Sequence, residues 1–391
     1  MPFGPPEPVL VHGAGHDLPG TGSSRVDRVI ATAALVAAAA TLGAPIQVAG
    51  QTSLSPEPIL SLAPEPGFEF YQVRGLILPE SGGVAVANDG SGQILWFDAS
   101  GHRVDVLGGP GEGPGEFQAL SDLLSCGTEV IAWDGVADRV TVYRDRELVR
   151  DFRVPLLDGQ VPEQVSCSAD SLVFLYRLYD PPSEMGPYRP RVAIHAFGFD
   201  GTHLGHVATV PGTERYRHET GDGPRVFGAV TRVAVHDGRT VVGTGDEDPA
   251  DLAGSVTFAL PGSEEPITEE QLSAQQSREL ARVEARYPSA APALRRNQAV
   301  YDYPDLFPRH TRMFFDDGGR LWVRRFLRPL DRQERWVIFD PAGSVLATVQ
   351  APEGLAVMAV RGDRVAGVWK DELDIEHVLV YGLRGVGGGN R

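Results

Sequence analysis

Four stretches of this chain share one pattern. Each is an alternating apolar strand that ends in an aromatic residue, followed by a tight turn led by Asp or Arg and the start of another strand. The stretches are residues 94–101, 140–147, 196–201 and 336–343. A unit of this size cannot bury its hydrophobic face alone, so several copies must pack together. The repeat therefore constrains the architecture far more than it constrains the chemistry.

The spacing of corresponding aromatic residues gives the period of the repeat. Phe97 and Tyr143 are 46 residues apart, and Phe339 and Tyr381 are 42 residues apart. A period of about 40–45 residues, with four strands in each unit, is typical of a β-propeller blade. Counting the units along residues 51–384 predicts an all-β fold, a six-bladed β-propeller.

Two longer intervals interrupt the period. The interval from Tyr143 to Phe199 contains a proline-rich insertion at residues 180–190. The next interval is long enough for two units and a further insertion at about residues 263–308. A threonine-led capping box there predicts a helix over residues 268–286. We expect this helical insertion between blades four and five.

The sixth blade lacks a fourth strand in its own part of the sequence. A short apolar strand at residues 58–62 belongs to no other blade, and we expect residues 59–62 to pair with the strand that ends at Leu383. This pairing would close the ring and remove a sheet edge that otherwise promotes association. The glycine-rich residues 385–391 are expected to be a disordered tail.

Residues 1–50 have the composition of a leader followed by a secretory signal. Arg25 and Arg28 precede an alanine-rich apolar run at residues 29–42, and small residues follow it as in a cleavage site. The run is short for a bilayer, so no stable membrane insertion is expected after the signal is removed. A buried alanine-rich helix is the alternative. The signal predicts an exported protein, periplasmic or extracellular, whose mature chain begins near Gln51.

Export permits disulfide bonds, and the chain has two cysteines. Cys126 and Cys167 are 41 residues apart and begin the same part of consecutive units. They could therefore bridge neighbouring blades. Two buried free thiols are the alternative, because matching positions on adjacent blades diverge from the axis and can exceed the reach of a disulfide.

The charge of the chain excludes some classes of partner. With 52 acidic and 35 basic residues, the formal net charge is −17. Nucleic acids require a basic face, and anionic membrane surfaces attract basic segments. We therefore expect a monomer with no nucleic-acid partner, whose partner is a protein, a peptide, a small molecule or a carbohydrate.

Two motifs resemble those of a known family. Residues 108–117 read GGPGEGPGEF, which resembles the signature loop of exported bacterial six-bladed propellers of the NHL-repeat-like, TolB-like kind. Residues 317–323 read DGGRLWV and are similar to a turn of NHL-type blades. The resemblance covers about residues 57–384. It implies a fold that serves binding scaffolds as well as calcium-containing lactonases and lyases, so it does not decide the activity.

One acidic segment is a candidate metal site. Asp246, Asp248 and Asp251 lie within six residues, and carboxylate oxygens at this density can hold calcium. The segment lacks the glycine and the terminal glutamate of an EF-hand loop, and a solvated acidic loop is the alternative. Calcium is the leading cofactor hypothesis, and otherwise no cofactor is expected.

The topology of a propeller places two kinds of connection at opposite ends of its blades. Here the connections between blades, and those between the second and third strands of a blade, include all the long segments. Ligand sites concentrate on long loops of a rigid scaffold, so we expect any ligand to bind on this long-loop face, over the central channel. The candidate ligand-binding residues near the strand ends of this face are Glu112, Tyr176, Arg177, Arg225, Arg324, Lys370 and Asp371.

The sequence contains no nucleophile elbow and no Cys–His arrangement at a recognisable spacing, so no catalytic residue is predicted. A binding or interaction module is therefore the favoured function. The alternative is a calcium-dependent lactonase, hydrolase or lyase of the NHL-like propeller type on the same face. The two hypotheses differ in whether carboxylates from several blades converge at the channel.

Overall fold

The computed structural model describes residues 52–62, 69–178, 181–219 and 221–385. The chain divides into two units, Met1–Gln47 and Val48–Arg391. The first unit lies outside the described residues, and so does the predicted leader and signal. Residues 386–391 of the predicted tail are also outside the description. The fold described below is that of the second unit.

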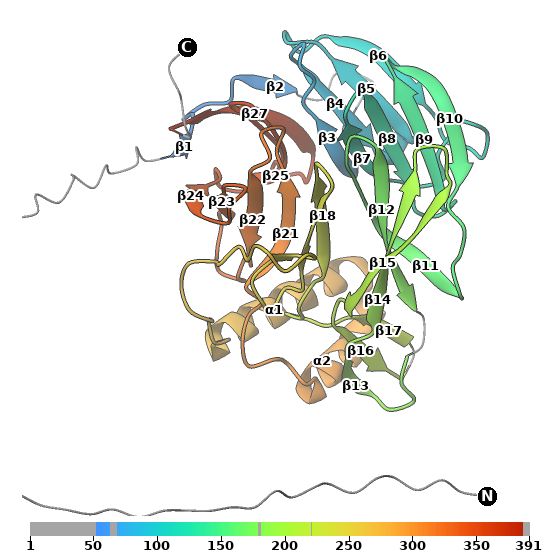
Figure 1. Cartoon of the computed structure of the whole chain (residues 1–391). Helices are drawn as coiled ribbons and strands as arrows, with labels where there is room; N and C mark the ends of the chain where they lie inside the picture. The colour runs from blue at the N-terminus through green and yellow to red at the C-terminus, as the bar shows by residue number, and fades with distance from the viewer. Residues whose placement is uncertain (1–51, 63–68, 179–180, 220, 386–391) are drawn as a thin grey trace, which may run out of the picture. The chain divides into compact units, whose positions relative to one another are not determined.

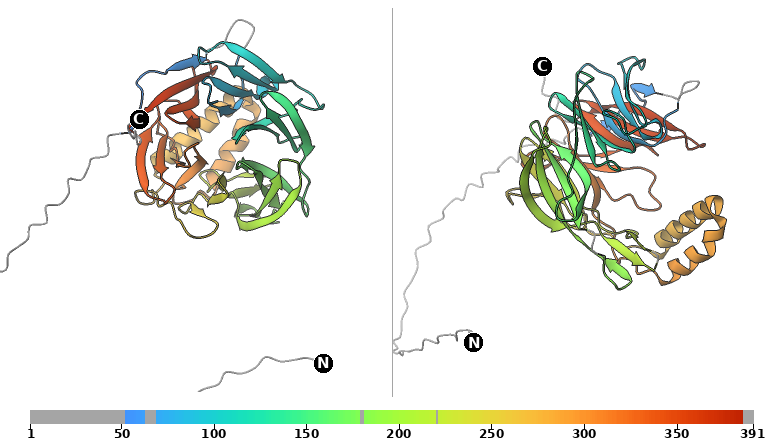
Figure 2. Two further views of the ribbon diagram at one scale, coloured as in Figure 1. Left: turned by 45° about the horizontal axis from the view of Figure 1, so that its top comes forward. Right: turned by 90° about the vertical axis from the view of Figure 1, so that its right-hand side faces the viewer.

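Within the described residues, six antiparallel sheets follow one another as blades of a propeller (Figures 1 and 2). The first strand of each blade lies at the axis, and later strands pair outward. Blades one to three are β3 (Val73–Ile77), β4 (Val84–Asn88), β5 (Gln93–Phe97), β6 (Arg103–Gly108); β7 (Leu120–Cys126), β8 (Glu129–Asp134), β9 (Arg139–Arg144), β10 (Glu147–Arg153); and β11 (Gln160–Cys167), β12 (Ser171–Leu178), β14 (Arg191–Gly198), β15 (His203–Pro211). Blades four to six are β18 (Arg232–His236), β19 (Arg239–Gly243), β20 (Ala250–Asp251); β21 (His310–Phe315), β22 (Leu321–Arg325), β23 (Arg335–Phe339), β24 (Val345–Gln350); and β25 (Ala356–Arg361), β26 (Arg364–Lys370), β27 (Glu376–Arg384).

The hydrophobic core lies between the blades, because the middle of each sheet faces a neighbouring sheet on both sides. All five residues of β4 are buried. Val84 and Val86 pack in a cluster with Val378 of blade six, whereas Ala85 packs in a cluster with Leu123 of blade two. Successive side chains of the strand thus point to opposite faces of the sheet, and each face packs against an apolar neighbouring blade. This explains why these strands are almost wholly hydrophobic.

The repeated sequence unit is the hairpin between the third and fourth strands of a blade. Its Asp holds the turn: the Asp98 carboxylate accepts hydrogen bonds from the backbone N–H groups of Ser100 and His102, each at 2.9 Å. In blade three the buried aromatic residue of the unit is Phe197, which pairs with Leu172 of β12. In the sequence, the repeat of blade three was measured from Phe199, and this position was therefore wrong by two residues, one pleat of the strand.

Two short strands close the ring, one at the predicted residues 59–62 and one before it that was not predicted. Both β1 (Ser53–Leu54) and β2 (Leu60–Leu62) pair antiparallel with β27. The backbone N–H of Ile59 also donates to the carbonyl of Val380 at 2.7 Å, and Leu62 is buried in the core. The beginning of this unit therefore completes the last blade and covers the edge of β27.

A seventh, three-stranded sheet is not a blade. It joins β13 (Gly186–Tyr188), from the proline-rich insertion of blade three, to β16 (Arg215–His218) and β17 (Gly221–Pro224), from the connection to blade four. This pairing shows that the two kinds of long connection meet on one face.

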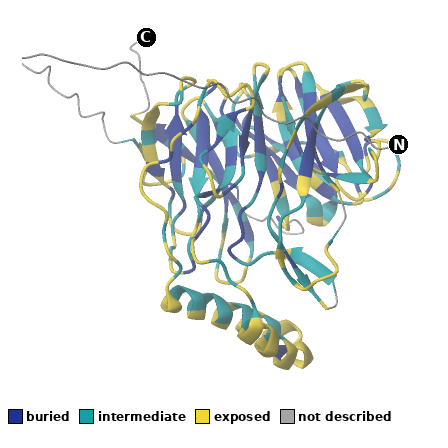
Figure 3. Ribbon diagram, turned by 60° about the horizontal axis from the view of Figure 1, so that its bottom comes forward, coloured by how far each residue is buried: buried dark blue, intermediate teal, exposed yellow. Residues whose placement is uncertain are grey.

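The helical insertion stands on the same face (Figure 3). Helix α1 (Glu269–Arg286) begins with the predicted capping box, in which Thr268 and Gln271 exchange hydrogen bonds. A short 3-10 turn (Pro288–Ala290) leads to a second helix that was not predicted, α2 (Ala291–Val300). Beyond α2, Tyr301 stacks on Tyr216 of strand β16 with ring centres 4.0 Å apart. Figure 2 shows both helices behind the middle of the ring.

Candidate functional site

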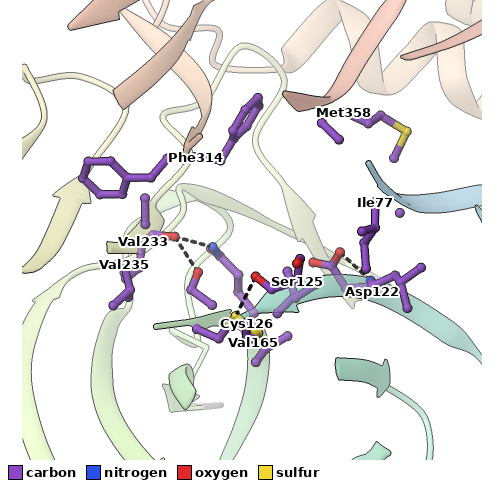
Figure 4. A pocket seen from close by; sticks show the side chains of 18 of the residues that line it. Ile77, Asp122, Ser125, Cys126, Val165, Val233, Val235, Phe314 and Met358 are labelled. Atoms are coloured by element: carbon purple, nitrogen blue, oxygen red, sulfur yellow. Dashed lines mark hydrogen bonds between the residues drawn. A yellow bond between two sulfur atoms is a disulfide. The ribbon is translucent and has the colours of Figure 1, made fainter. Parts of the chain in front are cut away.

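A cavity of about 1130 Å³ occupies the axis of the propeller (Figure 4). The innermost strands of all six blades contribute to its wall: β3, β7, β11, β18, β21 and β25. No described residue of the helical insertion lines it, so the helices do not fill the channel. A cavity of this volume can accommodate a small organic molecule.

Most of the inner strands contain a β-bulge near the end that adjoins the long-loop face. A bulge adds one unpaired residue and redirects the side chains around it, and bulges are frequent beside functional sites. These irregularities lie between Val73 and Gly75, Leu120 and Asp122, Pro162 and Gln164, His310 and Arg312, and Val357 and Ala359.

Charged side chains from three blades gather at this end of the channel. Asp122 and Arg312 directly follow the bulges of β7 and β21, and Arg232 is the first residue of β18. All three residues line the cavity and are partly buried. Because they are up to 190 positions apart in the sequence, only the closed ring brings them together.

Two other charges at this end are matched within the protein. Arg324 pairs with the buried Glu334 and donates to the Thr311 hydroxyl at 3.0 and 3.1 Å. Glu163 pairs with Arg177 from the neighbouring strand β12. These pairs leave Arg232 and Arg312 with Asp122 as the remaining charges of the group.

The remaining arginines are poorly satisfied. Among the described residues, the Arg312 guanidinium has no hydrogen-bond or ion-pair partner, and that of Arg232 donates only to the Thr231 carbonyl at 3.2 Å. Burial lowers the pKa of both arginines. Burial also raises the pKa of Asp122 to about 6, although Arg312 and Arg232 oppose this shift. At neutral pH the three groups carry a net positive charge inside a strongly acidic protein.

The wall beyond the charged group contains both polar and apolar side chains. Partly exposed side chains of Val235, Phe314 and Met358 line the cavity there (Figure 4). The channel therefore has a cationic end and, beyond it, apolar side chains on the three neighbouring inner strands β18, β21 and β25.

Of the two alternatives for the cysteines, the disulfide bond is present: it joins Cys126 and Cys167 and lies in the channel wall. It joins the ends of β7 and β11, whose Cα atoms are 5.8 Å apart. The expected divergence of the blades does not prevent the bond, because inner strands are closely packed at the axis. The contact between β3 and β7 on the other side shows the same close packing, since a Cβ atom added to Gly75 would lie 2.7 Å from the backbone nitrogen of Leu123.

The predicted ligand-binding residues fall into several groups. Arg324 lines the cavity, and Arg177 reaches its wall through Glu163. Tyr176 is a correction: it is fully buried, and its hydroxyl donates to the Pro155 carbonyl at 2.9 Å. Its aromatic ring belongs to the core between blades two and three, so it cannot reach a ligand on the surface.

The other predicted residues stabilise connections of the long-loop face. Arg225 donates to the Asp302 carbonyl at 3.0 Å and so holds the helical insertion. The Lys370 ammonium lies 3.2 Å from Glu376, and Asp371 accepts backbone hydrogen bonds within its own turn. The Glu112 carboxylate accepts a hydrogen bond from Gln118 at 2.9 Å within the glycine-rich loop. None of these four residues lines the cavity.

The predicted metal ligands do not converge. Asp246 pairs with Arg189 at 2.6 Å and Asp248 pairs with Arg309 at 2.9 Å, whereas Asp251 accepts hydrogen bonds from Ser255 in a hairpin. Asp251 is the last residue of strand β20, whereas Asp246 and Asp248 precede this strand. In the described ranges, no group of three or more His, Cys, Asp or Glu side chains could hold a metal ion.

Sequence reasoning missed Asp122, Arg232 and Arg312. A signal was present, since each is a charged residue in the first half of an inner strand. Its meaning depends on which strands are innermost and where the bulges lie.

Comparisons with known proteins assign no family to this chain. No family model and no curated protein matches the chain. Similar solved structures include a protein of Bacteroides fragilis described as exported, with 12% identity over 87% of this chain and 98% of that one and a TM-score of 0.47. A DUF4221 member from Bacteroides vulgatus is 8% identical over 86% and 99%, with a TM-score of 0.49. The calcium-binding regucalcin of Agrobacterium tumefaciens is 11% identical over 85% and 96%, with a TM-score of 0.39.

At these identities and TM-scores, the similar structures assign no function to this chain. No helix among the described residues is long and apolar enough to cross a membrane.

Proposed function

We propose that this protein is an exported binding module of the NHL-like propeller type, whose ligand enters the central channel from the long-loop face. The observation that carries the proposal is the cavity lined by all six inner strands, with its unmatched charges at one end. Rigid inner strands hold these groups in place without a ligand, which lowers the cost of binding. The long connections and the helical pair surround the entrance.

Two further features support the exported location. The basic, apolar and small-residue order of residues 25–50 is that of a secretory signal. The bond between Cys126 and Cys167 is of a kind that persists in oxidising compartments.

The charges of the channel favour binding over the calcium-dependent alternative. Calcium sites require several converging oxygen ligands. Here Arg232 and Arg312 flank Asp122, and their positive charge disfavours a divalent cation at the same place.

A channel-filling substitution tests the proposal. Ser125 lies on β7 in the channel wall and is exposed, so Ser125→Trp places an indole in the cavity (Figure 4). Ser344→Trp makes the same change in an exposed hairpin of blade five and is the matched control. Both variants are first checked for folding by circular dichroism and thermal melting.

Ligand-observed NMR then screens sugars, amino acids, nucleotides and organic acids against the three proteins. We expect at least one compound to bind the unaltered protein and Ser344→Trp but not Ser125→Trp. Binding that survives in Ser125→Trp, or no binding to the unaltered protein, contradicts the proposal.

A further inference from the structure

We infer that the channel binds an amphiphilic organic anion, whose oxyanion group lies between Arg232 and Arg312 and whose apolar part lies along Val235, Phe314 and Met358. This inference rests on the proposed function, since it names the ligand class for the same channel. Neither the comparisons nor the sequence motifs assign a ligand to these residues.

The positions of the two arginines carry the first part of the argument. Arginine side chains in this protein usually have a carboxylate partner, as in the pairs of Arg324 with Glu334 and Arg177 with Glu163. Among the described residues, Arg232 and Arg312 have no such partner within ion-pair distance, although both line a cavity. A guanidinium group that is partly removed from water recognises a carboxylate or phosphate through paired N–H donors.

Asp122 supplies an opposing charge but does not saturate the two arginines. Its carboxylate accepts the backbone N–H of Leu123 at 2.9 Å and has no ion pair within 4.0 Å with either arginine. A single negative charge opposite two positive ones leaves one positive charge for a ligand. This excess lies in a confined space, where electrostatic attraction is stronger than at an open surface.

The apolar side chains among the lining residues carry the second part. Val235, Phe314 and Met358 each pack against a core cluster and remain partly exposed in the cavity. Covering such side chains with an apolar group is favourable by about 25 cal/mol per Å² of area removed from water. Inorganic anions use only the arginines, whereas an anion with an aryl or alkyl body uses both regions.

Three probes separate these two contributions: acetate, 4-phenylbutyrate and the neutral amide of 4-phenylbutyrate. Isothermal titration calorimetry at neutral pH measures their affinity for the full chain without its leader. We expect 4-phenylbutyrate to bind tightest, because acetate lacks the apolar part and the amide lacks the charge. Loss of the hydrogen bonds between the carboxylate and the guanidinium groups should weaken binding of the amide by about tenfold or more.

Substitutions assign the charge to the arginines. Arg312→Gln and Arg232→Gln should each weaken the binding of 4-phenylbutyrate by about tenfold. The affinity for the amide should change by less than about twofold. Arg150→Gln removes an exposed arginine of the outer strand β10 and should change neither affinity, since this residue lies far out in its blade. Asp122→Asn removes the opposing charge and should strengthen binding of the anion.

The outcomes distinguish failure of this inference from failure of the proposed function. Equal affinity for the anion and the amide, unchanged binding in Arg312→Gln, or weaker binding in Asp122→Asn would overturn the anion site. If another compound of the NMR screen still loses binding in Ser125→Trp, the channel remains the ligand site. Anion binding that is unaffected by Ser125→Trp would contradict both.

Discussion

Breaking the bond between Cys126 and Cys167 should markedly destabilise the propeller. The two residues are 41 positions apart, and the bond restricts the unfolded chain by closing that loop. The chain-entropy relation for a loop of this length corresponds to about 4 kcal/mol of stability at about 25 °C. Cys126 is also buried in the cluster that contains Trp133, so the variant Cys126→Ala/Cys167→Ala loses some packing in addition.

Three samples separate the covalent contribution from the packing contribution. The samples are the oxidised protein, the same protein kept reduced in a thiol reductant without alkylation, and the double alanine variant. Each is unfolded in urea and followed by tryptophan fluorescence. Reduction keeps both sulfur atoms, so its effect isolates the cross-link. We expect a loss of about 2–4 kcal/mol on reduction and a further small loss in the double variant. Removal of the cross-link should also increase the dependence on urea, because the unfolded chain expands.

A thiol assay in denaturant provides the control. The oxidised protein should show no reactive thiol, and the reduced protein should show two, in agreement with the two cysteines of the chain. Oxidised and reduced samples that unfold within about 1 kcal/mol of each other would refute the argument that the bond restrains a long loop.

Two further predictions concern ring closure and the channel carboxylate. Leu62→Ala should lower the free energy of unfolding by about 2–5 kcal/mol, because Leu62 is buried against β27. Ile59 is 58% exposed, so Ile59→Ala should change the free energy of unfolding by less than about 1 kcal/mol. Equal urea midpoints for the two variants would contradict closure by β2. Burial raises the pKa of Asp122 from 3.8 to about 6, so the folded state binds this proton more tightly than the unfolded state, and stability falls as the pH rises through that interval. At pH 8, Asp122→Asn should therefore be about 1–2 kcal/mol more stable than the unaltered protein, less than the full linkage value of about 3 kcal/mol because water reaches the channel. At pH 4 the two proteins should be nearly equal in stability. The same difference in stability at both pH values would exclude this titration.

Much of the fold could be predicted because its signals are local. Alternating apolar residues specify strands, and the Asp-led hairpins recur because Asp98 and Asp340 satisfy the N–H groups of their own turns. The capping box before α1 is equally local. Ring closure followed from counting, since one blade lacked a strand and residues 59–62 lacked a blade.

The errors arose where tertiary contacts decide the local structure. Tyr176 is a polar aromatic residue near a strand end, yet packing between blades two and three buries it. Helix α2 has no side-chain cap and is held by the tyrosines that follow it, so its sequence gave a weak signal. The short strand β20 forms only because β19 offers an edge to pair with.

The amino-acid sequence by itself determined that this protein repeats one four-stranded unit and that the repeats form a closed six-bladed ring. Only the tertiary structure decided what lies at the centre. Asp122, Arg232 and Arg312 belong to no motif, and their meeting depends on the order of strands in three blades and on the bulges before two of them. The physical reason is that periodicity of two fixes a strand, whereas one inserted residue reverses the face on which every following side chain lies.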